Sequence, residues 1–376
     1  MKFHRWEIPY AFLFSTMVTF AFVIVLKYQV KRSRPLPLFL GFLFLQYLAV
    51  SFVLSLSRDS ALLAFLIFSF GSWANASLKF GRAKIAWVLV SLSSMIIGMT
   101  FRPWLSFSLP FLVLGLNRII QVFEIRLRKL LFPALGTLML VSLPLALDQT
   151  FHKAQELVPS YPQQQVMIMD LSSMACLSAD VAQTKNALMS LQKIANSERL
   201  TKEILCSQFY PQNWASVVFY GATNGSNSAL RMIKPGDEST YIQLQDSWLT
   251  TILNQFPAYI QTKLMIGSQF LLAGESPSFS HGSIQGLITL PFELTKALRI
   301  FSALPVLLLL VVMTFSKRRF LWDSRAIAII SGFYLTFLGI SMIAFIGDNQ
   351  RYILPGAIIV YFLLFLRNTW SDNVTL

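Results

Sequence analysis

Long apolar runs separated by short polar or basic connections make up most of this chain, and each run predicts a membrane-spanning helix. The runs define about nine candidate spans: 10–27, 37–56, 60–76, 85–100, 104–117, 131–147, 300–316, 326–346 and 352–368. A perpendicular helix needs about 20 residues to cross a bilayer, and several runs are shorter. We therefore expect an α-helical polytopic membrane protein in which some helices are distorted or partly re-entrant.

A different pattern fills the long segment between the sixth and seventh runs. "QQQVMIMDLSSMACLSAD" (163–180) suits a strand or the start of a helix, and 182–205 has helical spacing. Residues 241–274 are helical in pattern, with a break before Pro257. Apolar positions lie on one side of 286–301, which predicts an interfacial helix that leads into the next span.

These patterns divide the chain into three predicted domains. Residues 1–147 form an N-terminal membrane domain of about six spans. Residues 148–299 form an extracytoplasmic domain, mixed α/β or mostly helical, which ends in the interfacial helix. Residues 300–376 form a C-terminal membrane domain of about three spans.

Composition supports the membrane assignment. Hydrophobic residues make up 55% of the 376 residues and charged residues 13%, whereas soluble domains carry about 25% charged residues. The formal net charge is +14, but the lysines and arginines lie in short clusters between apolar runs. That distribution is typical of a topology signal rather than of a nucleic-acid surface, so we expect membrane lipids and no nucleic acid as partners.

The basic clusters also predict orientation, because positively charged loops stay in the cytoplasm. The main clusters fall on one side of the predicted spans: Lys27, Lys31, Arg32 and Arg34; Lys79, Arg82 and Lys84; Arg118, Arg126, Arg128 and Lys129; Lys317, Arg318, Arg319 and Arg325; and Arg367. The chain is therefore predicted to be a multi-pass protein of the inner (plasma) membrane. Its N-terminus would lie outside and its C-terminus in the cytoplasm.

This orientation places three short polar stretches on the outer face, beside the 148–299 domain. In the first stretch Arg58 and Asp59 lie between two spans. Two interpretations stay open. Arg58 snorkels while Asp59 caps a helix that starts at Ser60, or the two residues belong to a site for an anionic lipid-linked phosphate. Arginine binds phosphate at two points, and a helix N-terminus adds a favourable dipole.

The other two stretches carry further arginines. Arg102 lies in "TFRPW" (100–104), where it is either an interfacial anchor or a phosphate contact. Arg351 lies in "GDNQR" (347–351), where Asp348 would orient it towards the same headgroup layer. Three arginines from separate loops on one face together predict a phosphate-binding site.

Both cysteines of the chain, Cys176 and Cys206, lie in the predicted extracytoplasmic domain. Two cysteines in an oxidising compartment can form a disulfide. Two buried free thiols would serve equally well as small apolar side chains. Sequence spacing does not decide between these alternatives.

Several short motifs, taken in order, resemble bacterial polytopic membrane glycosyltransferases of the GT-C type and their relatives. The motifs are spread from about residue 10 to 368, and they read "SRDSALLAFLIF" (57–68), "FRPWLSFSLPFLVL" (101–114), "VMIMDLSSMACLS" (166–178), "CSQFYPQNW" (206–214), "DSWLTTILNQFPAYIQTKL" (246–264) and "DNQRYILPG" (348–356). The resemblance implies an enzyme that takes a sugar from a polyprenyl-phosphate donor at the outer membrane face. The acceptor would be a lipid, a glycan or a protein.

The sequence departs from this family at its beginning. Such enzymes usually place an acidic catalytic residue in the first outer loop, after a span that starts in the cytoplasm. Here the chain is predicted to begin outside, and Glu7 is the only acidic residue before the first span. The resemblance therefore implies that the usual opening span and its catalytic loop are missing. At the first motif, Arg58 stands where related sequences often carry a lysine.

If the family's chemistry is retained, the transfer is inverting. A carboxylate removes the proton of the acceptor hydroxyl as it attacks the sugar, and arginines stabilise the departing lipid phosphate. Asp59 is the first candidate base and Asp170 the second, with a turn-forming cap as the alternative role of Asp170. Arg102 and Arg351 are the candidate phosphate contacts. No cofactor is expected, and the sequence does not indicate a divalent metal.

Two other classes of function stay open. A polysaccharide polymerase or ligase would also use arginines and aspartates at the outer face. A non-catalytic transporter or scaffold is the third alternative. A transporter carries ionisable groups at mid-depth or broken helices at its substrate site, whereas the charges here cluster at the ends of the spans. The Walker A loop, the dinucleotide fingerprint, GxSxG and HExxH are absent from the sequence.

Overall fold

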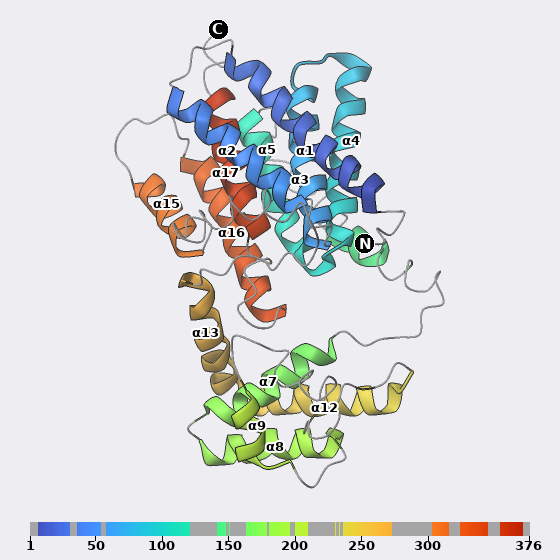
Figure 1. Cartoon of the computed structure of the whole chain (residues 1–376), viewed down its shortest axis with the longest axis vertical. Coiled ribbons are helices and arrows are strands. Elements are labelled where there is room, and N and C mark those ends of the chain that lie inside the picture. The colour runs from blue at the N-terminus through green and yellow to red at the C-terminus, as the bar shows by residue number, and fades with distance from the viewer. Residues whose placement is uncertain are drawn as a thin grey trace, which may run out of the picture. The chain divides into compact units, whose positions relative to one another are not determined.

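The computed structural model describes residues 7–30, 36–53, 58–120, 141–147, 150, 163–178, 180–195, 200–209, 230, 233, 236–272, 303–315, 324–344 and 354–370. Within these residues the regular structure is helical and contains no strand, as expected for an α-helical protein. The chain divides into two compact units. Unit 1 contains Met1–Phe151, Gly274–Ile340 and Gln350–Leu376, and unit 2 contains His152–Ala273 and Ser341–Asn349. Figure 1 labels the helices of both units.

The helices of unit 1 coincide with the apolar runs of the sequence. They are α1 (Glu7–Val30), α2 (Leu36–Val53), α3 (Arg58–Ala76), α4 (Gly81–Thr100), the 3₁₀-helix η1 (Pro103–Ser108), α5 (Leu109–Ile120), α15 (Ala303–Phe315), α16 (Ser324–Ala344, within unit 1 up to Ile340) and α17 (Leu354–Trp370). Of the sixth candidate span, 131–147, only 141–147 is described, and it is helical. The remaining candidate spans each contain a described helix.

Length and composition qualify three of the described helical segments as membrane spans: Pro9–Lys27, Gly81–Thr100 and Pro103–Ile120. Three further apolar helices are shorter: Ala303–Thr314, Ala326–Ser341 and Leu354–Leu366. The long apolar helices support a membrane protein. The number of spans and their orientation stay predictions from the sequence.

α3 is the central helix of unit 1 (Figure 1). Most of its side chains are buried. It packs against α1, α2, α4 and α17. Two glycines allow this close packing: a Cβ atom at Gly71 would lie 2.6 Å from Cα of Ala21, and one at Gly98 would lie 2.9 Å from Cβ of Phe65. Small residues at such contacts let helix backbones approach, which increases van der Waals contact between membrane helices.

Unit 2 is a cluster of helices: α7 (Gln164–Leu177), α8 (Val181–Ala195), α9 (Lys202–Gln208), α12 (Glu238–Asn254) and α13 (Phe256–Leu272). The 163–180 segment, which the sequence allowed as strand or helix, forms α7. The break expected before Pro257 falls at Gln255, between α12 and α13. The predicted 182–205 helix is two helices, because Thr201 caps a new one: its side chain accepts a hydrogen bond from the backbone N–H of Ile204.

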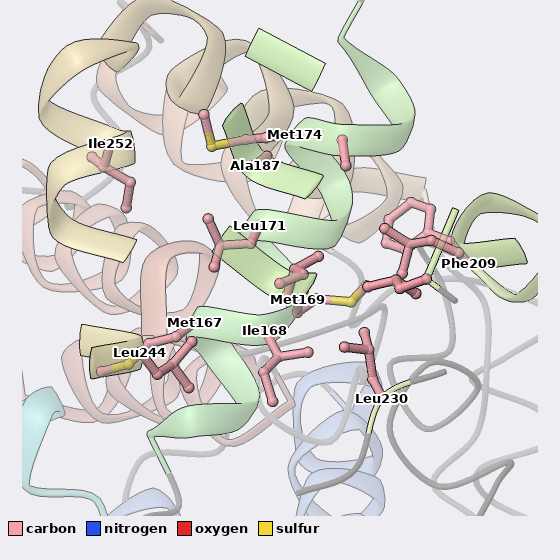
Figure 2. Close-up of a cluster of buried hydrophobic side chains, with 14 of the residues drawn as sticks. Met167, Ile168, Met169, Leu171, Met174, Ala187, Phe209, Leu230, Leu244 and Ile252 are labelled. Atoms are coloured by element: carbon pink, nitrogen blue, oxygen red, sulfur yellow. The ribbon is translucent and has the colours of Figure 1, made fainter. Parts of the chain in front are cut away.

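α7 is the core helix of unit 2. Residues 167–175 of α7 are all buried, including the polar residues Asp170, Ser172 and Ser173. Helices α8, α9, α12 and α13 all pack against it. Figure 2 shows Met167, Met169 and Leu171 of α7 among side chains from other segments, including Phe209 and Leu230.

The boundaries of the two units differ from those of the predicted domains. Unit 2 begins at His152 rather than 148, and its main segment ends at Ala273 rather than 299. In its described residues unit 2 is mostly helical, which is one of the two predicted alternatives. The interfacial helix predicted at 286–301 lies outside the described residues.

Candidate functional site

Asp59 and Arg102, two of the candidate site residues, form a two-point ion pair in unit 1. Nε of Arg102 donates to Oδ1 of Asp59 at 2.7 Å, and Nη2 donates to Oδ2 at 2.9 Å. The Asp59 side chain is 4% exposed and that of Arg102 is 20% exposed. This fork-to-fork geometry is the strongest arrangement of a guanidinium and a carboxylate, and it fixes the plane of the guanidinium.

The helices α3 and α4 bring the two residues together. They are connected by a short turn and pack closely, so the start of α3 lies beside the end of α4. Oγ of Ser91 on α4 donates to the carbonyl oxygen of Ser69 on α3 at 2.8 Å. The rings of Phe65 and Phe101 stack with their centroids 5.9 Å apart. These contacts set the register of the two helices, and with it the position of the ion pair.

Local sequence then orients each partner. α3 begins at Arg58, so Asp59 lies in the first helical turn and not at a cap before Ser60, as one interpretation of the sequence assumed. The partner residue Arg102 directly precedes Pro103, the first residue of η1. A proline disfavours a helical conformation at the residue before it. The backbone of Arg102 is held at both ends: its N–H donates to Met99 O at 3.0 Å, and its carbonyl accepts from Leu105 N at 2.9 Å.

The geometry of the Asp59–Arg102 pair determines what each residue can do chemically. A guanidinium carries five N–H donors, and Arg102 gives two of them to Asp59. Arg102 also has interactions beyond Asp59, and its side chain reaches the surface of unit 1. An arginine oriented by a buried carboxylate and exposed at its edge is well suited to contact an anionic oxygen. Asp59 itself is engaged through both oxygens, so in this state it does not present a basic atom to a substrate.

Asp170, the second candidate base, lies in unit 2 and is also paired. It sits in the middle of α7, so the alternative role as a turn-forming cap is wrong. Nζ of Lys263 on α13 lies 2.6 Å from Oδ1, and Nε1 of Trp248 on α12 donates to Oδ2 at 3.1 Å. The ammonium group of Lys263 also lies 5.5 Å from the centre of the Tyr259 ring. One carboxylate thereby joins three helices.

Burial dominates the electrostatics of this cluster. Asp170 is 2% exposed, and the loss of hydration raises the pKa of its carboxyl, against the opposing effects of Lys263 and of the hydrogen bond from Trp248. Burial also raises the pKa of the Tyr259 hydroxyl, and the negative charge of Asp170 adds to that effect. Asp170 therefore has the environment of a residue that organises the interior of unit 2.

Sequence reasoning missed Lys263 and Trp248. A signal was present, because Lys263 is the only charged residue of α13 and Asp170 the only one of α7. A lone charge on each of two otherwise uncharged helices predicts a buried pair, since an unpaired buried charge is costly. The sequence does not say which acidic residue pairs with which lysine.

The structure pairs the two cysteines. Cys176 at the end of α7 forms a disulfide with Cys206 on α9, with Cα atoms 5.4 Å apart and a sequence separation of 30. Disulfides persist in oxidising compartments. The bond also ties the short helix α9 to the core helix of unit 2.

Replacing both cysteines by serine is expected to lower the free energy of unfolding of unit 2. A cross-link over 30 residues restricts the unfolded chain and contributes about 3.5 kcal/mol in the chain-entropy description. Hydrogen exchange of the α7 amides in the full chain measures the loss, with a reductant as an independent way to break the bond. The double variant should be insensitive to the reductant. Equal protection of α7 with and without the bond would contradict the expectation.

The structure does not place the remaining candidate residues. Asp348 and Arg351 are outside the described residues, as is the side chain of Arg58. Within the described ranges, no group of three or more His, Cys, Asp or Glu side chains is arranged to hold a metal ion. The structure thus places Asp59 with Arg102 in one unit and Asp170 in the other.

Comparisons with protein families, with curated proteins and with solved structures give no match for this chain.

Proposed function

We propose that this chain is a cell-envelope membrane protein of the glycosyltransferase type that binds a polyprenyl-phosphate-linked sugar at the outer membrane face. The observation that carries the proposal is the two-point Asp59–Arg102 pair. It orients an arginine at the end of a predicted span, and in the proposed topology that position is at the depth of lipid headgroups. The motif resemblance supports the same substrate class, and a disulfide in unit 2 agrees with an oxidising compartment.

The proposed topology has about nine spans, with the N-terminus outside and the C-terminus in the cytoplasm. The 148–299 segment, Asp59, Arg102, Asp348 and Arg351 then share one aqueous boundary. Arg102 and Arg351 contact the lipid phosphate, and Asp348 orients Arg351. In this chemistry the chain binds two partners, the lipid-linked donor and a glycan or lipid acceptor.

The ion pair suggests how donor binding and proton transfer are linked. A donor phosphate draws the Arg102 guanidinium towards itself and replaces one of its hydrogen bonds to Asp59. That exchange leaves one Asp59 oxygen to accept the proton of the acceptor hydroxyl. The hydroxyl oxygen then attacks the anomeric carbon of the sugar, while the bond from that carbon to the phosphate oxygen breaks. Arg102 then stabilises the negative charge of the departing lipid phosphate.

One observation favours a second candidate, a non-catalytic scaffold or binding protein. Both candidate bases are occupied by cations: Asp59 by Arg102, and the buried Asp170 by Lys263. A protein that only binds a lipid-linked sugar needs the arginine but needs no available carboxylate. The two candidates differ in whether the sugar is transferred.

A transfer assay with radiolabelled polyprenyl-phosphate sugar separates these possibilities. We expect Asp59→Asn to lower transfer by about 100-fold or more, because the amide cannot take the proton. Donor binding should weaken less than in Arg102→Ala, because the guanidinium is still present. Arg102→Ala should lose both binding and transfer. Arg82→Ala, which removes an exposed arginine at the start of α4, is the matched control and should behave as wild type.

The outcomes of this assay discriminate clearly. Equal transfer by the wild type and the Asp59 and Arg102 variants would eliminate the site. Absence of transfer by every protein, with donor binding that depends on Arg102, would identify the chain as a binding protein without catalysis.

A further inference from the structure

The outward side of α13 reverses the pattern expected of a helix in water. Its only charged residue, Lys263, is buried against Asp170. Its outward positions include Phe256, Ile260 and Leu264, which recur every four residues and so share one face. A helix that packs on a core and faces water would carry its charges outside and its apolar side chains inside.

The apolar face extends onto α12. Leu249 and Leu253, in the last turns of α12, are exposed as well, and Leu253 is 68% exposed. We call these five side chains, Leu249, Leu253, Phe256, Ile260 and Leu264, the 249–264 face. The other exposed positions between them are uncharged too: Thr250, Asn254, Pro257 and Gln261. A concentration of exposed apolar side chains without charges on a folded unit marks a contact with a membrane or a protein.

We propose that the 249–264 face of unit 2 inserts into the surface of the lipid bilayer. The chain on both sides of unit 2 belongs to unit 1, which carries the apolar helices long enough to span a membrane. Unit 2 is thus tethered to the membrane, and tethering makes even weak interfacial binding effective. Exposed apolar side chains on one face of a helix are the means by which interfacial helices enter the headgroup boundary.

The absence of basic residues from this surface determines which lipids it can bind. The 249–264 face carries no lysine or arginine, and the nearest exposed charge on α12 is the acidic residue Asp246. Attraction to anionic headgroups therefore contributes nothing to binding. The contact depends on the apolar side chains, so it forms equally with zwitterionic and anionic lipids and is insensitive to salt. It is independent of the proposed sugar donor.

A fluorescent label on single cysteines tests the proposal in the full chain. The two native cysteines form the disulfide, so an introduced cysteine is the free thiol that reacts. We choose Ile260→Cys and Leu264→Cys on the 249–264 face, and Lys193→Cys on α8 as the exposed control. Each variant carries an environment-sensitive dye and is reconstituted in phosphatidylcholine vesicles, with or without a lipid that bears a shallow nitroxide quencher.

We expect the nitroxide lipid to quench the dye at 260 and 264 about threefold more strongly than at 193. Addition of phosphatidylglycerol or of salt should leave that ratio unchanged. Equal quenching at all three positions would overturn the proposal. So would a blue-shifted dye at 264 that the nitroxide lipid does not reach, since protein would then cover the face. Energy transfer between dyes at 264 on different copies would identify a second chain as the occupant and overturn the lipid assignment.

Discussion

Replacing Lys263 by methionine is expected to lower the free energy of unfolding of unit 2 by about 3–5 kcal/mol. The substitution leaves the Asp170 carboxylate buried without its cation, 2% exposed between α7, α12 and α13. Hydrogen exchange of the α7 amides in the detergent-solubilised chain measures the loss, because these amides exchange only when unit 2 opens. Lys193→Met on α8 removes an exposed lysine instead and should change protection by less than about 0.5 kcal/mol.

A double variant shows whether the cost comes from the unpaired charge. Asp170→Leu combined with Lys263→Met replaces the ion pair by apolar side chains of similar size. Such replacements of buried pairs are often neutral or stabilising, so the double variant should be much more stable than Lys263→Met alone. A double variant as unstable as the single one would contradict this account of the cluster.

The pH dependence gives a second check on the same cluster. Burial raises the pKa of Asp170 above its ordinary value of 3.8 in the folded state, so the folded chain binds this proton more readily than the unfolded chain. The contribution of Asp170 to stability is therefore greatest at low pH. It falls as the pH rises from 3.8 through the raised pKa. Asp170→Asn does not titrate and should lack this slope.

The helix positions of unit 1 were largely predictable from sequence. A membrane span requires a continuous apolar run, so the pattern itself marks where each helix lies. The nearness of Asp59 and Arg102 was also predictable, since the two residues lie at one end of consecutive spans. The two-point pairing was not, because it depends on how α3 and α4 pack around Gly98 and Phe65.

Unit 2 was harder to predict, for a physical reason. Residues 166–178 contain one charge among apolar and small residues, a pattern that suits a buried strand, a buried helix or a segment ending at Asp170. Only the surrounding helices, which supply Lys263 and Trp248 as partners, allow α7 to continue through Asp170. Contacts between residues 78 and 93 positions apart leave no local signal in a single sequence.

Removing Arg102 is expected to have the largest effect on the proposed ligand. The guanidinium would form charge-assisted hydrogen bonds to the lipid phosphate, which are about twice as strong as neutral ones. Arg102→Ala should therefore weaken the binding of polyprenyl phosphate by about 100-fold. Arg102→Lys keeps the charge but loses the planar fork that Asp59 orients, so its affinity should lie between those of the wild type and the alanine variant.

Native mass spectrometry of the purified chain, offered polyprenyl phosphate and the uncharged polyprenol together, tests the central claim most directly. The two lipids differ only in the phosphate, so their ratio in the complex isolates its contribution from that of the hydrocarbon chain. We predict that the wild type and Arg82→Ala prefer the phosphate strongly and that this preference is about 100-fold weaker in Arg102→Ala. A preference for the phosphate that is unchanged in Arg102→Ala would contradict the account.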